Sequence, residues 1–336
     1  MLQKLFASLS AAVMLIVWLF PICPKDRFGG DIKEVRPNGS ELFAAREDAL
    51  ASGGGWYVTM NEEFDGDTLP EQWVCSPHGL RNTEYWCDNM VEVKDGQVLV
   101  KIMKTDDNVC DVCPAEGVFT SGIETRKMVD GKSVSLFEQA YGYFECQVQI
   151  PKGEGLWSAF WLQSANQGSI GNKGRDGTEI DVYESVFMNS PSTVAHAAIW
   201  NGYGAFYRDH PVKIDVGYDL YEGTHTYGLL WTPKKYVFFV DGTPTFETRA
   251  NGVCQVPDFL RLTIESRPGG THGPHGYLLD EMTNTRENPA VFAIDWVKVY
   301  QNTEFEKHIK APSDFASFNK LIEKPVIKTV LGWFGY

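Results

Sequence analysis

Short alternating runs separated by tight turns dominate the sequence between residues 56 and 302. Residues 91–94 (VEVK) and 98–102 (VLVKI) flank Asp95-Gly96, and residues 236–240 (YVFFV) run into Asp241-Gly242. Asp-Gly between alternating runs is typical of a two-residue β-hairpin. No strong helical period appears in this region. The pattern predicts an all-β fold, a two-sheet antiparallel β-sandwich.

The two ends of the chain differ from this central region. Residues 5–22 carry no charge and are mostly apolar, and Lys25, Asp26 and Arg27 end that stretch. We expect residues 1–23 to be a signal peptide, with an uncleaved signal anchor as the alternative. Residues 24–55 read as a linker, because residues 52–55 are SGGG. We therefore expect a catalytic domain at 56–302, a C-terminal tail at 303–336, and a secreted or cell-surface protein.

The charge balance limits the possible partners. The chain has 30 Lys plus Arg and 44 Asp plus Glu, so its net charge is −14. Binding to nucleic acid is disfavoured, because counterion release needs cationic side chains. A neutral or cationic ligand suits this charge, and membrane contact is expected only through the N-terminal segment if it is uncleaved.

Seven cysteines occur, and omitting Cys23 leaves an even number. Cys110 and Cys113 form a C-x-x-C pair, but no second pair at zinc-site spacing is present. A disulfide within a loop, or two free thiols, is the expected state. The other cysteines allow many pairings, so the sequence assigns none.

An acidic strand is the most informative segment for chemistry. Residues 178–185 read TEIDVYES, and strand alternation puts Glu179 and Asp181 on one face. Glu184 has the opposite parity, and a β-bulge of one residue would return it to that face. Crowded carboxylates have divergent pKa values, which is what hydrolysis of a glycosidic bond requires. The alternative is a solvated polar edge, and the spacing leaves both retaining and inverting geometries open.

Two tryptophans lie shortly before the acids, in the segment GLWSAFWLQ of residues 155–163. The flat apolar faces of Trp157 and Trp161 suit the CH faces of pyranose rings, and core packing is the alternative role for each.

Several motifs in a fixed order resemble glycoside hydrolase family 16, in particular its laminarinase-like branch. They are NEEFDG at 61–66, RNTEYW at 81–86, YGYFE at 141–145, GLWSAFW at 155–161, EIDVYE at 179–184, HTYGLLWT at 225–232 and IDWVKVY at 294–300. The resemblance implies a jelly roll with a concave substrate cleft and a retaining double displacement. Glu179 would be the nucleophile, Glu184 the acid and base, and Asp181 their partner. It also implies substrate contacts from Asn82, Trp157, Trp161, His196 and Trp200. For His196, a contact with Asp181 and a buried structural role are the alternatives.

The resemblance further implies a structural calcium held by Asp295 with carbonyl oxygens from Gly96 and near Glu63. Hard oxygen ligands suit this ion. No catalytic metal or other catalytic cofactor is expected.

The leading hypothesis is a monomeric endo-β-1,3-glucanase that also accepts mixed-linkage β-1,3-1,4-glucan. An endo-β-galactosidase acting on galactan or host glycans, and a non-catalytic carbohydrate-binding protein, are the alternatives. Glu265 stands where many relatives carry an Asn-rich segment, so the sequence departs from the family pattern at this position. The sequence does not decide between water and a sugar as the acceptor.

Overall fold

The computed structural model describes ten stretches of the chain, and the fold is built from them. They are residues 32–34, 54–81, 84–106, 109–114, 116–153, 155–170, 172–185, 190–204, 206–266 and 286–311. The expected signal segment, Asn82 and most of the linker and tail lie outside these residues. Within the expected linker, Ile32–Glu34 forms β1. No helix of the described residues is both long and apolar enough to cross a membrane.

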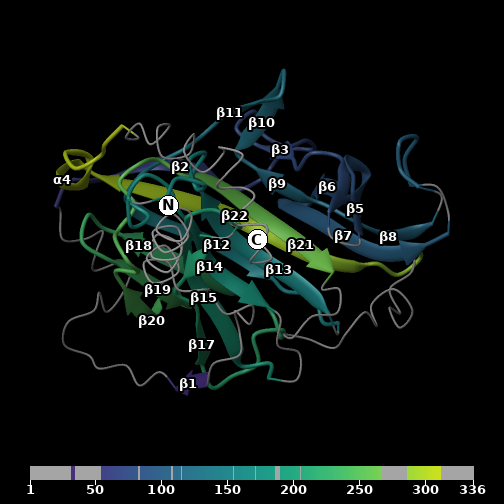
Figure 1. Ribbon diagram of the computed structural model, residues 1–336. Coiled ribbons are helices and arrows are strands. Elements are labelled where there is room, and N and C mark those ends of the chain that lie inside the picture. Colours follow the sequence, from purple (N-terminus) through teal and green to yellow (C-terminus); the bar gives the residue numbers. More distant parts are fainter. Residues whose placement is uncertain are drawn as a thin grey trace, which may run out of the picture.

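Two large sheets form the body of the molecule, which confirms the predicted β-sandwich (Figure 1). The first sheet carries the acidic strand near its middle. Its strands, in spatial order, are β1, β17 (Val212–Asp215), β15 (Thr193–Trp200), β14 (Glu179–Ser185), β13 (Leu156–Gln163), β21 (Phe259–Ser266), β9 (Gly122–Glu124) and β3 (Val74–Cys75), with β16 (Arg208–Asp209) paired to β15.

The second sheet covers the back of the first. Its strands, in spatial order, are β20 (Thr243–Thr248), β19 (Tyr236–Val240), β18 (His225–Trp231), β12 (Gly142–Gln149), β22 (Ala290–Asn302), β7 (Gln97–Thr105), β8 (Gly117–Thr120), β5 (Glu84–Trp86) and β4 (Gly79–Arg81), with β2 (Trp56–Glu62) on β22 and β6 (Val91–Lys94) on β7. Almost all neighbouring strands are antiparallel; β1 with β17 and β5 with β8 are parallel.

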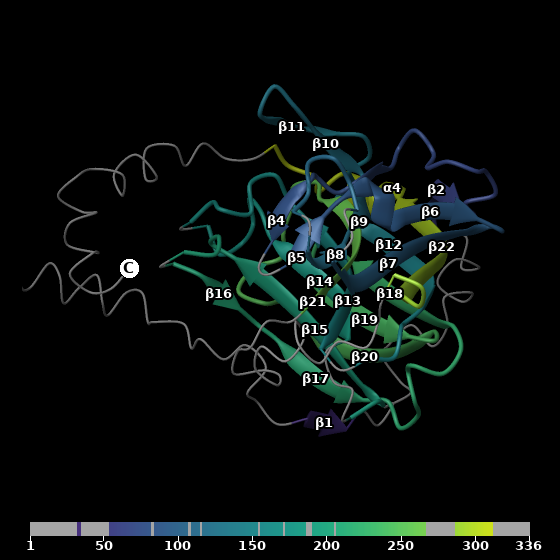
Figure 2. The same cartoon turned by 90° about the vertical axis from the view of Figure 1, so that its right-hand side faces the viewer.

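The remaining elements are small. A separate hairpin of β10 (Arg126–Val129) and β11 (Lys132–Ser135) projects beyond the sandwich (Figure 2). A 3₁₀ turn, η1 (Asp88–Met90), follows β5. The short helix α4 (Thr303–Glu306) begins the C-terminal tail, and the Asn302 side chain caps it by accepting from the Glu304 N–H.

Both predicted Asp-Gly hairpins are present. Asp95 and Gly96 have φ of 54° and 76°, and Asp241 and Gly242 have φ of 48° and 72°. Two successive positive φ values match the right-handed twist of the paired strands. The turns join β6 to β7 in a regular register and β19 to β20 in a register that shifts between Phe238 and Phe239.

The core lies between the sheets, where the inward side chains of both meet. Tyr183 of β14 stacks on Tyr227 of β18 with ring centroids 3.9 Å apart. His196 of β15 stacks on Phe238 of β19 at 4.9 Å. Every residue of β14 and β15 is buried. The acidic strand is therefore covered on its back by the second sheet, and its front face is the one that lines the pocket described next.

Candidate active site

A single bulge in β14 determines the geometry of the site. Asp181 pairs with Ala197 and Glu184 with Ala195, so three steps along β14 match two along β15. On the other side Asp181 pairs with Trp161 and Tyr183 with Phe160, so Val182 is the extra residue. An extra residue reverses the parity of everything after it. The predicted bulge is present, and it turns Glu184 to the same face as Glu179 and Asp181.

All three acids line one pocket on the front of the first sheet. Its walls come from β4, β13, β14, β21 and the loop between β15 and β16, and its lining residues are Arg81, Trp157, Ala159, Trp161, Glu179, Asp181, Glu184, Tyr203, Thr263 and Glu265. The three carboxylates are 2–4% exposed. A solvated polar edge, the alternative considered for this strand, does not describe them.

Strand β13 supplies the partners of the acids. Residues directly opposite each other in antiparallel strands share a face, and Gln163 lies opposite Glu179. The Gln163 amide donates to Glu179 Oε2 at 3.1 Å. The Trp157 indole N–H donates to Glu184 Oε1, also at 3.1 Å. Each terminal acid of the motif therefore has a hydrogen-bond donor from the neighbouring strand.

Trp161 lies between two cationic side chains, those of Arg261 and Arg81. Its indole N–H donates to Thr263 Oγ1 at 3.1 Å. The Arg261 guanidinium carbon lies 4.0 Å from its ring centroid, and that of Arg81 lies 5.9 Å away. These cation–π contacts hold the indole in place. Trp157 and Trp161 both line the pocket with the acids, and their contact with sugar stays a prediction.

A charged network closes the pocket at β4. Arg81 Nε donates to Glu265 Oε1 at 2.9 Å, and this guanidinium also lies 4.7 Å from the centroid of Trp86. Glu84 lies behind the pair and accepts from Ser266 Oγ at 2.6 Å. Burial, together with the nearby Glu265 carboxylate, raises the pKa of Glu84 to about 8. Glu265, the departure from the family pattern, is thus neutralised by Arg81 in the pocket wall.

Two predicted substrate contacts are wrong in this structure, because they lie on the opposite face of β15. Ala195 and Ala197 face the pocket with the acids, so His196 faces the core by alternation. His196 is 0% exposed, and Trp200, of the same parity, is 6% exposed and does not line the pocket. The bulge reverses parity in β14 alone, so no similar feature brings these β15 side chains forward.

Sequence reasoning missed five residues at the pocket: Arg81, Tyr203 and Thr263 line it, and Gln163 and Arg261 contact its lining residues. A signal for three of them was available, since Gln163 has the parity of Trp157 and Trp161, and Arg261 and Thr263 share the alternation of a predicted strand. Tyr203 lies in a loop, where no period indicates direction. The residue as a whole is 62% exposed, yet its hydroxyl lies at the pocket and donates to Glu179 Oε2.

Two of the residues expected to hold calcium, Gly96 and Asp295, lie at or beside the β6–β7 turn. The Gln97 amide lies 3.4 Å from Asp295 Oδ1, and Asp65 Oδ1 is 4.0 Å from where a Cβ on Gly96 would stand. The Glu63 carboxylate is paired with Lys298 at 2.8 Å, which leaves only its main chain for a metal. Carboxylates beside a turn fit a hard cation. A structural calcium held here stays a prediction.

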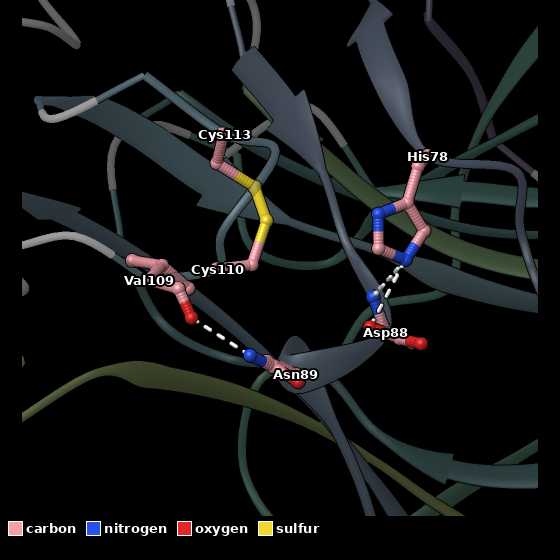
Figure 3. The surroundings of a disulfide bond; sticks show 6 residues. All are labelled: His78, Asp88, Asn89, Val109, Cys110 and Cys113. Carbon is pink, nitrogen blue, oxygen red and sulfur yellow. Dashed lines mark hydrogen bonds and ion pairs between the residues drawn. A yellow bond between two sulfur atoms is a disulfide. The ribbon is translucent and has the colours of Figure 1, made fainter.

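The C-x-x-C pair forms a disulfide, Cys110–Cys113, one of the two states predicted for it (Figure 3). Cys87 lies beside it. Among the described residues, these three cysteines are the one set of three or more His, Cys, Asp or Glu residues whose ligand atoms all lie within 4.8 Å of one another. Since two of the three sulfurs are bonded to each other, the group offers a single thiol. Cys75, Cys146 and Cys254 are unpaired in the described structure.

A two-sheet antiparallel sandwich with three carboxylates beside two tryptophans in one pocket is the arrangement of a β-jelly-roll glycoside hydrolase. The profile of glycosyl hydrolases family 16 matches residues 86–267. The chain belongs to this family.

Named relatives agree with this assignment, and a solved structure shares the fold. An endo-1,3-1,4-β-glycanase of Rhizobium meliloti is 28% identical over 183 residues, 54% of this chain, and a glucan endo-1,3-β-glucosidase of Cryptopygus antarcticus is 25% identical over 201 residues, 56% of this chain. The matched regions span 33% and 67% of those relatives. The laminarinase catalytic domain of Thermotoga maritima has the same fold, with a TM-score of 0.56 at 23% identity over 74% of this chain and 99% of that domain.

Proposed function

We propose that this chain is a retaining endo-β-glycosidase that hydrolyses β-1,3-glucan of the laminarin type and accepts mixed-linkage β-1,3-1,4-glucan. One observation carries the proposal: the bulge directs Glu179, Asp181 and Glu184 into one pocket walled by Trp157 and Trp161. The printed activities of the Rhizobium meliloti and Cryptopygus antarcticus relatives support a β-glucan.

The proposed reaction proceeds in two displacements. A Glu179 oxygen attacks the anomeric carbon while Glu184 gives its proton to the leaving glycosidic oxygen, so one C–O bond forms as another breaks. Glu184, now ionised, takes a proton from water, and that water displaces Glu179 from the anomeric carbon. Asp181 stands between them and favours divergent protonation of the two glutamates. The configuration of the sugar is retained.

The charge of the pocket supports a neutral polymer. Its lining residues include four carboxylates and one guanidinium, that of Arg81, which is paired with Glu265. A sulfated polysaccharide would meet these carboxylates and the chain's net charge of −14. Uncharged glucose units meet no such repulsion.

A galactan is the second candidate. A β-porphyranase B of Zobellia galactanivorans is 26% identical over 264 residues, which is 72% of this chain and 83% of that protein. Its coverage exceeds that of the glucanase relatives above. The test must therefore include galactans as well as glucans.

A polysaccharide panel with product chromatography tests the proposal. Laminarin and lichenan should yield oligosaccharides, with agarose, a sulfated galactan and mucin as the competing arms. Glu179→Gln should lower turnover at least about 10³-fold and leave polymer binding intact. Glu247→Gln, in a surface pair with Lys235 at 2.7 Å, is the matched control and should retain full activity. Turnover of a galactan but neither glucan would overturn the substrate, and unchanged turnover in Glu179→Gln would overturn the nucleophile.

We also propose that the protein is exported through its N-terminal apolar segment and acts as a monomer. N-terminal sequencing and light scattering of the secreted protein test these two points. A cell-associated product with an intact N-terminus would indicate the signal anchor instead.

A further inference from the structure

Tyr203 reaches the acid strand from outside the sheet. It lies in the loop between β15 and β16, and its hydroxyl donates to Glu179 Oε2. The Gln163 amide lies 2.8 Å from the same hydroxyl and 3.1 Å from the same carboxylate oxygen. Three side chains from three segments thus meet at one oxygen atom.

The loop backbone directs Tyr203 into the pocket. Asn201 and Gly202, which precede it, have φ of 67° and 71°, so the chain turns sharply after β15. The Gly202 N–H donates to the Gln167 carbonyl at 2.9 Å, and the Tyr207 N–H to the Gly204 carbonyl at 3.0 Å. The loop is therefore hydrogen-bonded on both sides of Tyr203.

The Tyr203 hydroxyl keeps the proton that it donates to Glu179. Burial of the hydroxyl, followed by the adjoining Glu179 carboxylate, raises the pKa of Tyr203 far above its ordinary value. It therefore keeps its proton. A hydrogen bond to the ionised form of a carboxylate favours that form and fixes its orientation.

We propose that Tyr203 is a positioning residue for Glu179: its hydroxyl, together with Gln163, holds the carboxylate ionised and oriented for attack on the anomeric carbon. This inference rests on the proposed function, in which Glu179 is the nucleophile. Other charged groups also face this carboxylate, and any pH effect of Tyr203 adds to theirs. They are Asp181 and Glu184 on β14, Arg261 and Glu265 on β21, Asp258 just before β21, and Arg81 on β4.

Tyr203→Phe tests the role by removing one oxygen atom and keeping the ring. We expect kcat/KM on the preferred polymer to fall roughly 10- to 100-fold, the loss typical of a hydrogen bond to a charged group. The fall should lie in kcat, and the acidic limb of the pH profile should move to higher pH, because the nucleophile loses a donor that favours its ionised form. Tyr203→Ala should show the same limb shift.

Tyr207→Phe is the matched control. Tyr207 lies in the same loop and its hydroxyl donates to the Asp209 carboxylate at 2.8 Å, outside the pocket. Its rate and pH profile should equal those of the native protein. An unchanged profile in Tyr203→Phe, or a loss confined to KM, would overturn the positioning role.

A measurement that needs no turnover separates this inference from the proposed function. Carboxyl ¹³C NMR of the glutamates, with Glu179 assigned by the signal missing in Glu179→Gln, gives the titration midpoint of Glu179. The midpoint should be higher in Tyr203→Phe than in the native protein and in Tyr207→Phe. Equal midpoints overturn the inference even in an active enzyme. A shifted midpoint in a protein that hydrolyses nothing upholds the Tyr203–Glu179 coupling and overturns the proposed function.

Discussion

His196 supports the acid strand from its buried side. Its Nδ1 lies 2.6 Å from the carbonyl oxygen of Val182, the extra residue of the bulge, so Nδ1 carries the hydrogen and donates. Its Nε2 faces the Thr245 hydroxyl at 2.9 Å. The ring thus ties the bulge to β20 of the second sheet. A side chain expected to touch sugar instead holds the backbone distortion that the pocket depends on.

Protonation of His196 should destabilise the fold in acid. Burial lowers its pKa from 6.5 to about 4, so between these values the unfolded chain binds a proton that the folded chain does not. Stability is complete above the unfolded pKa and falls as the pH drops through this window, by about 2 kcal/mol at pH 5. Urea unfolding at pH 7 and pH 5 measures the difference.

His196→Gln is the control for that experiment, because other groups also titrate in this range. Glu84, with its raised pKa, makes the fold more stable as the pH falls and so acts in the opposite direction. The pH 7 to pH 5 loss should be smaller in His196→Gln than in the native protein by about the His196 contribution. The same loss in both proteins would contradict the assignment.

At the scale of elements, β14 shows why one inserted residue matters. Without Val182 the segment would read E-I-D-Y-E, and strict alternation would then place all three acids on one face. With Val182 present, the bulge also places all three acids on one face. It directs both Val182 and Tyr183 toward the core, where each is 0% exposed. Two backbone solutions therefore give the same parity to the acids.

Deletion of Val182 tests this equivalence. We expect a folded protein that keeps some activity, lowered about 100-fold because the acids shift by roughly 1 Å. Circular dichroism and thermal unfolding report the fold, and polysaccharide turnover reports the site. The same deletion combined with Glu179→Gln should be inactive. If the deletion variant folds well but is as inactive as Glu179→Gln, then the bulge itself is required, and placing the three acids on one face is not sufficient.

For the whole molecule, the net charge of −14 predicts how salt affects turnover. Interaction with a neutral glucan has no long-range electrostatic component, so kcat/KM should change less than about twofold between 20 and 500 mM NaCl. A sulfated galactan should be repelled at low salt, and its turnover should rise as salt screens the repulsion. Uncharged agarose is the matched control for the galactan backbone. A strong rise with salt on laminarin would contradict the neutral-substrate proposal.

The local sequence determined the elements and the parity of the acids. The Asp95-Gly96 and Asp241-Gly242 turns follow from residues close in the chain, and the parity of residues 179–184 shows that Glu184 needs a bulge to share a face with Glu179. Backbone conformation at such positions depends on steric preferences of neighbouring residues, and it is therefore readable without knowledge of the tertiary structure.

Tertiary structure alone decided which face of each strand became the pocket. Both faces of β15 are buried, so its sequence carries no polar and apolar contrast. Only the stacking of His196 on Phe238 of the second sheet shows that His196 points inward. Tyr203 and the Arg81–Glu265 pair join segments far apart in the sequence. No local pattern encodes such contacts, because they form only when the loop, β4 and β21 are brought against β14 by the closure of the whole sandwich.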